Sequence, residues 1–178
     1  ENKTIFLIAN NPNISQTIYN TCNNLQVDNE SIIVRFNHVE KRTRSLFNSR
    51  TDILFLRYNA NPPLYYHGLG LNGLVYNLAS SKIYLIGGSK KLYTTITNKY
   101  AHHFLDKESV DRLWKVKSAS SGLVAITYFL DRFPDYKIIL VGFNFHKDQR
   151  KLRYHNFAQE ELIIIKLIEN NYPIEIWN

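Results

Sequence analysis

The stretch Ser120–Gly142, SSGLVAITYFLDRFPDYKIILVG, decides the fold class of this chain. Residues 120–133 carry apolar side chains at helical spacing, and the Pro-Asp pair that follows ends the helix. Tyr136–Val141, YKIILV, is the most hydrophobic of the expected strands and is closed by a glycine. A strand without a polar side is expected inside a sheet that is covered on both faces, as parallel sheets are.

The same alternation of strand and helix patterns extends over the rest of the chain. Further strands are expected at Thr4–Ala9, Ser31–Arg35, Asp52–Arg57, Lys82–Ile86 and Pro173–Trp177. Helices are expected at Ile14–Leu25, Gly68–Leu78, Leu92–Tyr100, Lys107–Trp114 and Asn156–Asn170. We therefore predict an α/β fold in which residues 1–178 form one domain, with a single doubly wound, mainly parallel sheet of Rossmann-like type and helices on both faces.

Composition limits the classes of protein to which the chain can belong. It has 178 residues, of which 44% are hydrophobic and 21% charged, as expected for a folded domain with a sizeable core. Its 22 Lys and Arg against 15 Asp and Glu give a net charge of +7, which favours an anionic partner such as a nucleotide, nucleic acid, anionic lipid or acidic glycan. A single cysteine excludes an internal disulfide, and no apolar run reaches the roughly 18–20 residues of a membrane span.

Asparagines stand at or just after the ends of four expected strands. In open α/β sheets ligands bind beyond the carboxyl ends of the strands, so these positions are candidate binding residues. An amide both donates and accepts hydrogen bonds, which suits phosphate, ribose and sugar hydroxyls. The alternative is that these asparagines serve turns, which they favour. The candidates are Asn10, Asn11, Asn37, Asn59 and Asn144.

Two helix starts carry further polar candidates. Ser120-Ser121-Gly122 can hold a phosphate or carboxylate through hydroxyls and helix amides, or can simply cap the helix. His155 opens the last helix in the sequence HNFAQE, where it can act as a general base or as a solvated cap. The first strand-to-helix turn lacks the GxGxxG fingerprint, and no GxxxxGK[ST] or HExxH pattern occurs in the chain, which disfavours classical dinucleotide and P-loop binding and leaves a metal site without support.

Taken together, these segments resemble the sialyltransferases. Ile5–Asn13 followed by Ile32–Asn37 resembles the large sialylmotif, and Ser120–Leu123 resembles the core of the small one. His155–Glu160 matches the very small motif, HxxxxE. The bacterial lipooligosaccharide sialyltransferases are similar over a longer stretch, Ser121–Trp177. The resemblance implies the GT-A variant of the Rossmann-like fold.

The resemblance also implies an activity and roles for single residues. The chain would be an inverting, metal-independent glycosyltransferase that moves sialic acid, or a related 2-keto sugar acid such as Kdo, from its CMP conjugate to a glycan hydroxyl. His155 would be the general base, Glu160 would support structure or orient a neighbour, and no cofactor is needed beyond the CMP-sugar donor. The leaving phosphate would be stabilised by Tyr154, Lys147, Arg150, Lys151 and Arg153. The donor would be bound by Asn10, Asn11, Asn37, Asn59, Ser120, Ser121, Gly122 and Asn144.

Two departures from the family pattern keep other functions open. Ala9-Asn10-Asn11-Pro12 stands where the family has Gly-Asn-Gly, and only His146–Tyr154 fills the interval of the family's long lid. The first alternative is therefore a CMP-sugar-binding domain with weak or no catalysis. The second is a basic nucleic-acid-binding module, which no RNP-like, helix-turn-helix or zinc signature supports, so nucleic acid is not an expected partner.

The expected partners and location follow from the resemblance and the composition. The glycan acceptor would belong to lipooligosaccharide or capsule. The lack of a signal peptide, disulfide or membrane span, with a composition rich in Asn, Ile and Lys, predicts a protein of the bacterial cytoplasm. The basic surface would bring it to the inner membrane as a peripheral protein.

Overall fold

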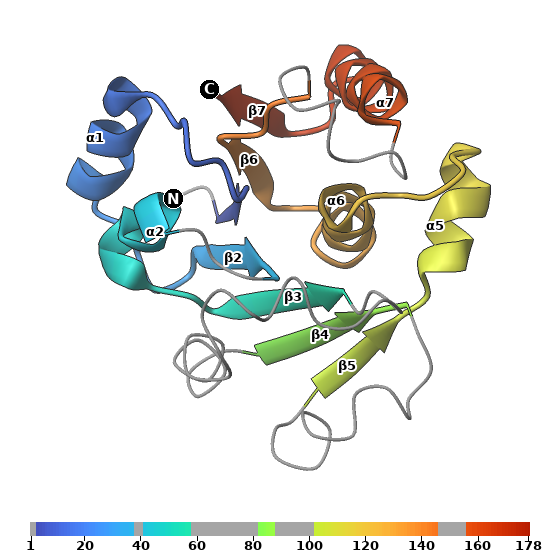
Figure 1. Ribbon diagram of the computed structural model, residues 1–178, viewed down its shortest axis with the longest axis horizontal. Coiled ribbons are helices and arrows are strands. Elements are labelled where there is room, and N and C mark those ends of the chain that lie inside the picture. The colour runs from blue at the N-terminus through green and yellow to red at the C-terminus, as the bar shows by residue number, and fades with distance from the viewer. Residues whose placement is uncertain (1–2, 38–40, 58–81, 88–101, 146–155) are drawn as a thin grey trace.

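Seven strands, all parallel, form the sheet in the order β5-β4-β3-β2-β1-β6-β7. The structure is a computed structural model that describes residues 3–37, 41–57, 82–87, 102–145 and 156–178 (Figure 1). The strands are β1 Thr4–Ile8, β2 Ile32–Phe36, β3 Ile53–Arg57, β4 Lys82–Ile86, β5 His102–Leu105, β6 Lys137–Val141 and β7 Ile174–Trp177. The helices are α1 Gln16–Asn24, α2 Lys41–Arg44, the 3-10 helix η1 Leu46–Ser49, α5 Lys107–Trp114, α6 Ser121–Arg132 and α7 Phe157–Glu169.

The doubly wound α/β architecture predicted from the sequence is confirmed. β4 and α5 have the predicted bounds, and the other predicted elements that fall in described residues differ by one or two residues at an end. Ser15 shows why α1 begins late, because its hydroxyl accepts from the Ile18 N–H at 3.3 Å and caps the helix. The helices predicted at Gly68–Leu78 and Leu92–Tyr100 lie outside the described residues.

Three short elements were not predicted. Strand β5 has the sequence HHFL, whose two histidines hide a strand pattern. It pairs only with β4, at one edge of the sheet, and an edge strand needs no continuous apolar run. Helix α2 and η1 have only four residues each, too few to show helical spacing.

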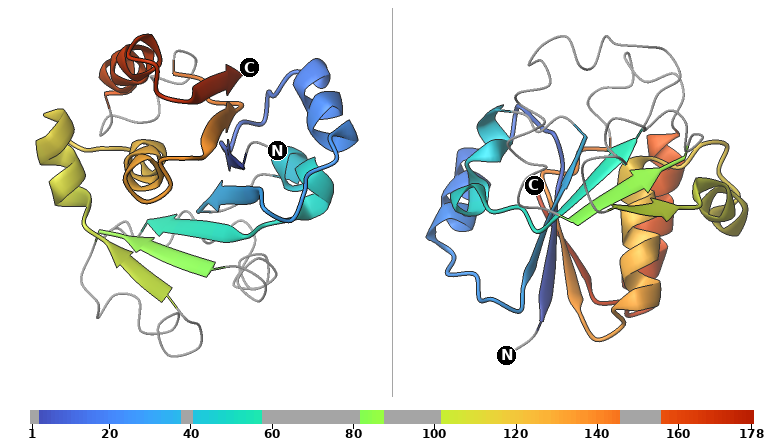
Figure 2. Two further views of the ribbon diagram at one scale, coloured as in Figure 1. Left: turned by 180° about the vertical axis from the view of Figure 1, so that it is seen from behind. Right: turned by 90° about the horizontal axis from the view of Figure 1, so that it is seen from below.

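Side chains that alternate along the strands fill two cores, one on each face of the sheet. On β1, Ile5 and Leu7 pack in the core beneath α6 and α7, whereas Phe6 and Ile8 pack in the core beneath α1 and η1. Figure 1 and Figure 2 show the sheet curving around α6, with α1 and α2 on its other side. Every helix in the described ranges is too short or too polar to cross a membrane.

The segment 43–51 is held to the sheet by a buried arginine, Arg35 of β2, which is only 1% exposed. Its guanidinium donates to the carbonyls of Thr43 at 2.6 Å and Leu46 at 2.8 Å, and to Thr51 Oγ1 at 2.9 Å. These three acceptors are two backbone carbonyls and one hydroxyl, so none of them carries a charge. Burial, with a smaller contribution from the charge of Arg44, lowers the pKa of Arg35 to about 10. Arg35 therefore fixes the connection between β2 and β3.

Candidate functional site

The chain order reverses between the neighbouring strands β1 and β6, from which the sheet winds in both directions. In open α/β sheets this switch point is where ligands bind, beyond the carboxyl ends of the strands. Asn11 joins the two strand ends, because its Nδ2 donates to the Gly142 carbonyl at 3.1 Å. Its Oδ1 accepts from the Asn13 N–H at 2.9 Å, closing an Asx turn. Asn11 thus shapes the edge at the switch point.

Asn10 and Asn37 extend this edge to β2 and β3. Asn10 Nδ2 donates to the Phe36 carbonyl at 2.7 Å, which closes the end of β2. Asn37 has a φ of 47°, a left-handed conformation that asparagine tolerates better than most residues, and its N–H donates to the Phe55 carbonyl at 2.7 Å. Three of the predicted asparagines, Asn10, Asn11 and Asn37, are therefore brought together, and each has a structural task at the edge.

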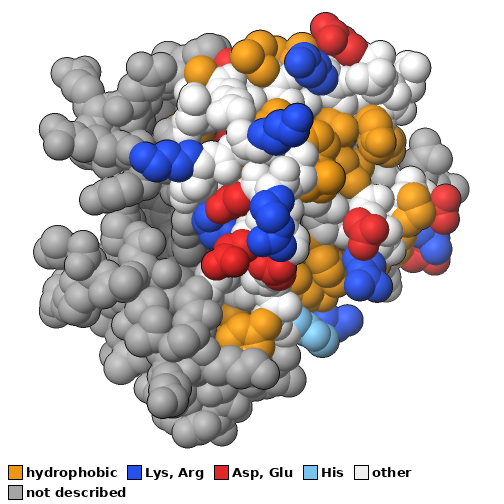
Figure 3. All heavy atoms as spheres, turned by 90° about the vertical axis from the view of Figure 1, so that its right-hand side faces the viewer, with side chains coloured by type: hydrophobic (Ala, Val, Ile, Leu, Met, Phe, Trp, Pro, Cys, Tyr) orange, Lys and Arg blue, Asp and Glu red, His pale blue; other side chains and the backbone are white. Residues whose placement is uncertain are grey.

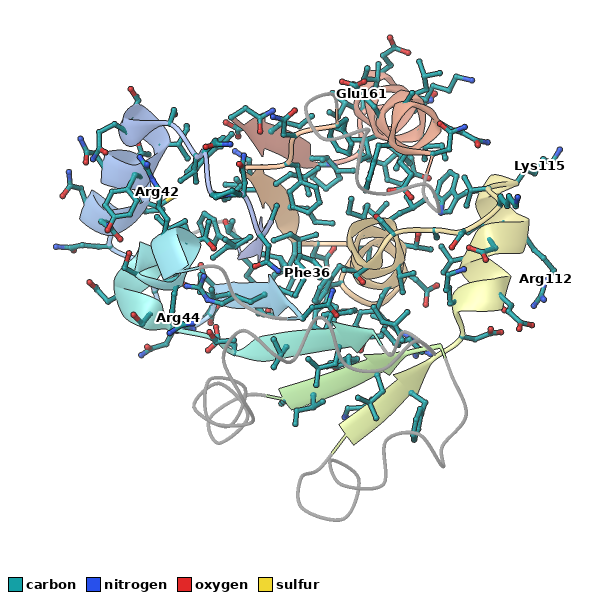
Figure 4. The ribbon with its side chains drawn as sticks, viewed as in Figure 1. Phe36, Arg42, Arg44, Arg112, Lys115 and Glu161 are labelled. Carbon is teal, nitrogen blue, oxygen red and sulfur yellow. The ribbon has the colours of Figure 1, made fainter. Side chains whose placement is uncertain are left out.

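Aromatic side chains form the floor below this edge. The rings of Phe36 and Phe143 meet edge to face with centroids 6.2 Å apart, and Phe145 lies 6.1 Å from Phe143. Figure 4 shows Phe36 between the sheet and α6. A Cβ at Gly122 would lie 2.7 Å from Phe143 Cε1, so only glycine lets the start of α6 approach the ring. The floor thereby joins β2, β6 and α6.

A buried carboxylate fastens the N-terminus of α6. Ser120 is the N-cap, and its Oγ accepts from the Leu123 N–H at 3.1 Å. Glu160 of α7 is 2% exposed and accepts twice from Ser120, from the backbone N–H at 2.7 Å and from Oγ at 2.6 Å. The small-motif serine and the glutamate of HxxxxE, 40 residues apart, are therefore in direct contact.

Two more side chains hold the segment between α5 and α6. Asp111 Oδ1 accepts from the Ala119 N–H at 2.6 Å, while its other oxygen pairs with Lys107. Gln159 Nε2 donates to the Lys115 carbonyl at 3.1 Å. Figure 4 shows the Lys115 side chain extending away from α6. Both ends of this segment are consequently tied to neighbouring helices.

The other predicted donor-binding residues differ in their surroundings. Ser121 is 8% exposed, and no residue of the described ranges makes a hydrogen bond to its hydroxyl. Asn144 is exposed beyond the end of β6. The first N–H groups of a helix have no partner inside it, so the backbone of Ser121 and Gly122 presents donors at this end of α6. The described part of the site is thus rich in donors.

Several predicted residues lie outside the described residues. His155 directly precedes Asn156, the N-cap of α7, whose Oδ1 accepts from the Gln159 N–H at 3.2 Å. The structure therefore describes the start of α7 from its N-cap Asn156 onward, and Asn156 directly follows His155 in the sequence. The other predictions outside the described residues concern Asn59, Tyr154, Lys147, Arg150, Lys151 and Arg153.

Sequence reasoning gave Glu160 only a general supporting role and missed the contribution of Asp111. A signal for Glu160 was present, because it shares the buried stripe of α7 with Ile164 and Leu167 at helical spacing. A carboxylate on an apolar stripe needs a hydrogen-bonding partner inside the protein. The apolar side chains of Leu162, Ile165 and Ile168 on the same helix are instead exposed.

The face over α5 carries charges of both signs. Figure 3 shows acidic and basic side chains interspersed on this side of the molecule. Arg112, for example, lies within 4.0 Å of both Asp106 and Glu108. In the described parts of the chain, no three His, Cys, Asp or Glu side chains are grouped as a metal site would require.

Comparison with known proteins returns no match. No protein-family model matches this chain, and neither a curated protein nor a solved structure does.

Proposed function

We propose that the chain is a glycosyltransferase that moves sialic acid, or a related 2-keto sugar acid, from its CMP conjugate to a glycan hydroxyl. The observation that supports this most strongly is the contact of Glu160 with Ser120. Two short motifs that match the family only as sequence are thereby neighbours in space, beside the switch point where such folds bind ligands.

The donor occupies the carboxyl edge of the sheet in this proposal. The phosphate lies by Asn10 and Asn37, and the sugar carboxylate lies at the N-terminus of α6, where the N–H groups of Ser121 and Gly122 favour an anion. Ser120 is already bonded to Glu160, so its role is to shape this end of the helix. Fixed donors of this kind stabilise charge that develops on a leaving phosphate.

The transfer proceeds with inversion and without a metal. His155 takes the proton of the acceptor hydroxyl while that oxygen bonds to the anomeric carbon of the sugar. The bond from that carbon to the phosphate oxygen breaks at the same time, and CMP leaves with the electron pair. A histidine suits this step because its pKa is close to neutral pH.

We further propose that the acceptor is a lipooligosaccharide or capsular glycan built at the inner face of the bacterial cytoplasmic membrane. The net charge of +7 supports attraction to anionic lipid or glycan. Over α5 the described basic side chains are interspersed with acidic ones, so these described residues form no continuous basic surface for nucleic acid (Figure 3).

Calorimetric titration with CMP, beside UMP, AMP and a short oligonucleotide, tests the donor site. We expect CMP-selective binding that Asn10→Ala weakens, and release of CMP from CMP-sialic acid when a glycan acceptor is present. His155→Ala should lower that rate by about 10²–10⁴, as the loss of a general base does. His103→Ala, on the edge strand β5, is the matched control.

Each other outcome has a clear meaning. CMP binding without turnover would indicate a sugar-nucleotide-binding domain. Oligonucleotide binding that falls steeply with salt, without CMP binding, would replace the proposal by a nucleic-acid-binding function.

A further inference from the structure

We infer that Glu160 is a positioning residue that sets the distance between the donor-binding end of α6 and the N-terminus of α7. This inference rests on the proposed function, because it concerns the alignment of the donor with His155. The observation that carries it is the double hydrogen bond of one buried carboxylate to one N-cap residue.

The contact is specific in its geometry. Both Glu160 oxygens are used on Ser120, one by the backbone N–H at 2.7 Å and the other by Oγ at 2.6 Å. Ser120 Oγ also accepts from the Leu123 N–H, so its proton is directed to Glu160. A glutamine cannot reproduce this pattern, because it offers one acceptor oxygen in place of the two that accept from the Ser120 N–H and hydroxyl.

Burial makes the contact rigid. Glu160 is 2% exposed, and a buried polar group that loses its partner costs the full desolvation penalty. The first turn of α7 is fastened a second time by Gln159, which donates to the Lys115 carbonyl. The segment leading into Ser120 is held independently by Asp111. The start of α7 and the start of α6 are therefore joined through short, directional bonds.

The consequence for catalysis follows from the order of residues. In the sequence His155 immediately precedes Asn156, the N-cap of α7, and stands five residues before Glu160. Ser121 and Gly122 lie immediately after Ser120 at the other end of the same contact. Loss of the contact leaves the asparagine edge at β1 and β2 untouched but misaligns base and donor, and a displacement of about 1 Å can cost about 10²-fold in rate.

The test measures kcat and CMP affinity separately, per CMP-binding site and well below the thermal midpoint of each variant. Glu160→Gln and Ser120→Ala should each lower kcat about 10–100-fold. The Kd for CMP should stay within about threefold of the wild-type value in both variants, because the binding edge is elsewhere. A purely structural role would lower the thermal midpoint without changing kcat per folded site.

Two variants and one combination sharpen the test. Ser120→Thr keeps the hydroxyl and should retain kcat within about threefold. Glu169→Gln makes the same charge change at the exposed end of α7 and should change neither kcat nor CMP affinity. The double variant Ser120→Ala, Glu160→Gln should be no slower than the slower single variant, since both remove one interaction.

The outcomes separate this inference from the proposed function. Wild-type turnover that Glu160→Gln leaves unchanged overturns the positioning role alone, and so does a double variant whose losses multiply. A wild-type chain that neither binds CMP nor releases it from the donor overturns the proposed function, and the positioning role with it.

Discussion

Two charged side chains are buried among the described residues, and they lie on opposite faces of the sheet. Arg35 of β2 faces the side of α1 and η1, where its guanidinium reaches backbone and hydroxyl acceptors across residues 43–51. Glu160 of α7 lies on the α6 side and uses both oxygens on the single residue Ser120. Arg35 therefore holds several residues of the segment 43–51, whereas the described contacts of Glu160 hold one residue, Ser120.

This difference indicates different tasks. Four acceptors converge on Arg35, and burial lowers its pKa to about 10 because the surroundings supply no carboxylate in the described residues. Removing Arg35 would take the donated hydrogen bond away from all four acceptors at once. Glu160 holds two donors of one residue beside the candidate site. We therefore expect Arg35 to control mainly stability, and Glu160 mainly alignment.

The largest expected effect is that of Arg35→Met. Methionine fills much of the volume but leaves the Thr43 and Leu46 carbonyls without a donor, so the free energy of unfolding should fall by about 3–5 kcal/mol. Urea unfolding followed by circular dichroism measures this. Arg42→Met, an exposed arginine on α2 that Figure 4 labels, should change stability by less than about 0.5 kcal/mol. Equal effects of the two substitutions would contradict the structural role of Arg35.

Glu160→Ala should have the next largest effect on stability. It leaves the N–H and hydroxyl of the half-buried Ser120 without their acceptor, and the free energy of unfolding should fall by about 2–3 kcal/mol. A double-mutant cycle with Ser120→Ala should give a coupling energy of at least about 1 kcal/mol. Additive losses in that cycle would show that the two side chains do not depend on each other.

Much of the sheet was predictable because its strands are continuous apolar runs with clear ends. Tyr136–Val141 and the strand at Lys82–Ile86 could be recognised without knowledge of their neighbours. Strand β5 could not, because its HHFL sequence becomes a strand only through pairing with β4. Helix α2 could not be predicted from the sequence either, because its position depends on a tertiary contact, the hydrogen bond from Arg35 to the carbonyl of its residue Thr43.

The candidate site was predictable in location but only partly in the tasks of its residues. Topology places the ends of β1, β2 and β6 together, so Asn10 and Asn11 were expected at one edge. Their hydrogen bonds to the Phe36 and Gly142 carbonyls depend on tertiary distances, which sequence spacing does not contain. The ring of Phe143 against Gly122 is likewise a packing fact, so a glycine assigned to ligand approach also has a steric reason.

Gly122→Ala tests the α6 side of the sheet in another way, because it crowds the start of α6 without removing a polar group. The new Cβ would lie 2.7 Å from Phe143 Cε1, so the ring or the helix must shift. We expect a loss of about 1–2 kcal/mol of stability, a typical cost of overpacking. Val124→Ala, one turn into the same helix, is the control, since it shortens a buried side chain without crowding the ring. An unchanged thermal midpoint for Gly122→Ala would show that the ring of Phe143 can move aside without loss of stability.

The smallest expected effect lies on the Arg35 side and depends on pH. Burial raises the pKa of the Cys22 thiol to about 11, from about 9.0 when exposed, although the charge of Arg35 acts in the opposite direction. A raised folded-state pKa gives stability that is complete below the unfolded-state pKa and is lost as pH rises toward the folded-state value. Between pH 8.5 and 10 the wild-type chain should therefore lose about 1 kcal/mol relative to Cys22→Ala.

Urea unfolding of both chains at pH 7, 8.5 and 10 measures that difference. It should be the same at pH 7 and 8.5, where the thiol is mostly protonated in both states, and should shrink only toward pH 10. A difference that stays constant to pH 10 would mean that the thiolate is accommodated beside Arg35 as easily as in water. The positive charge of Arg35 would then compensate a buried anion on its own face of the sheet, whereas the described contacts of Glu160 are hydrogen bonds from Ser120.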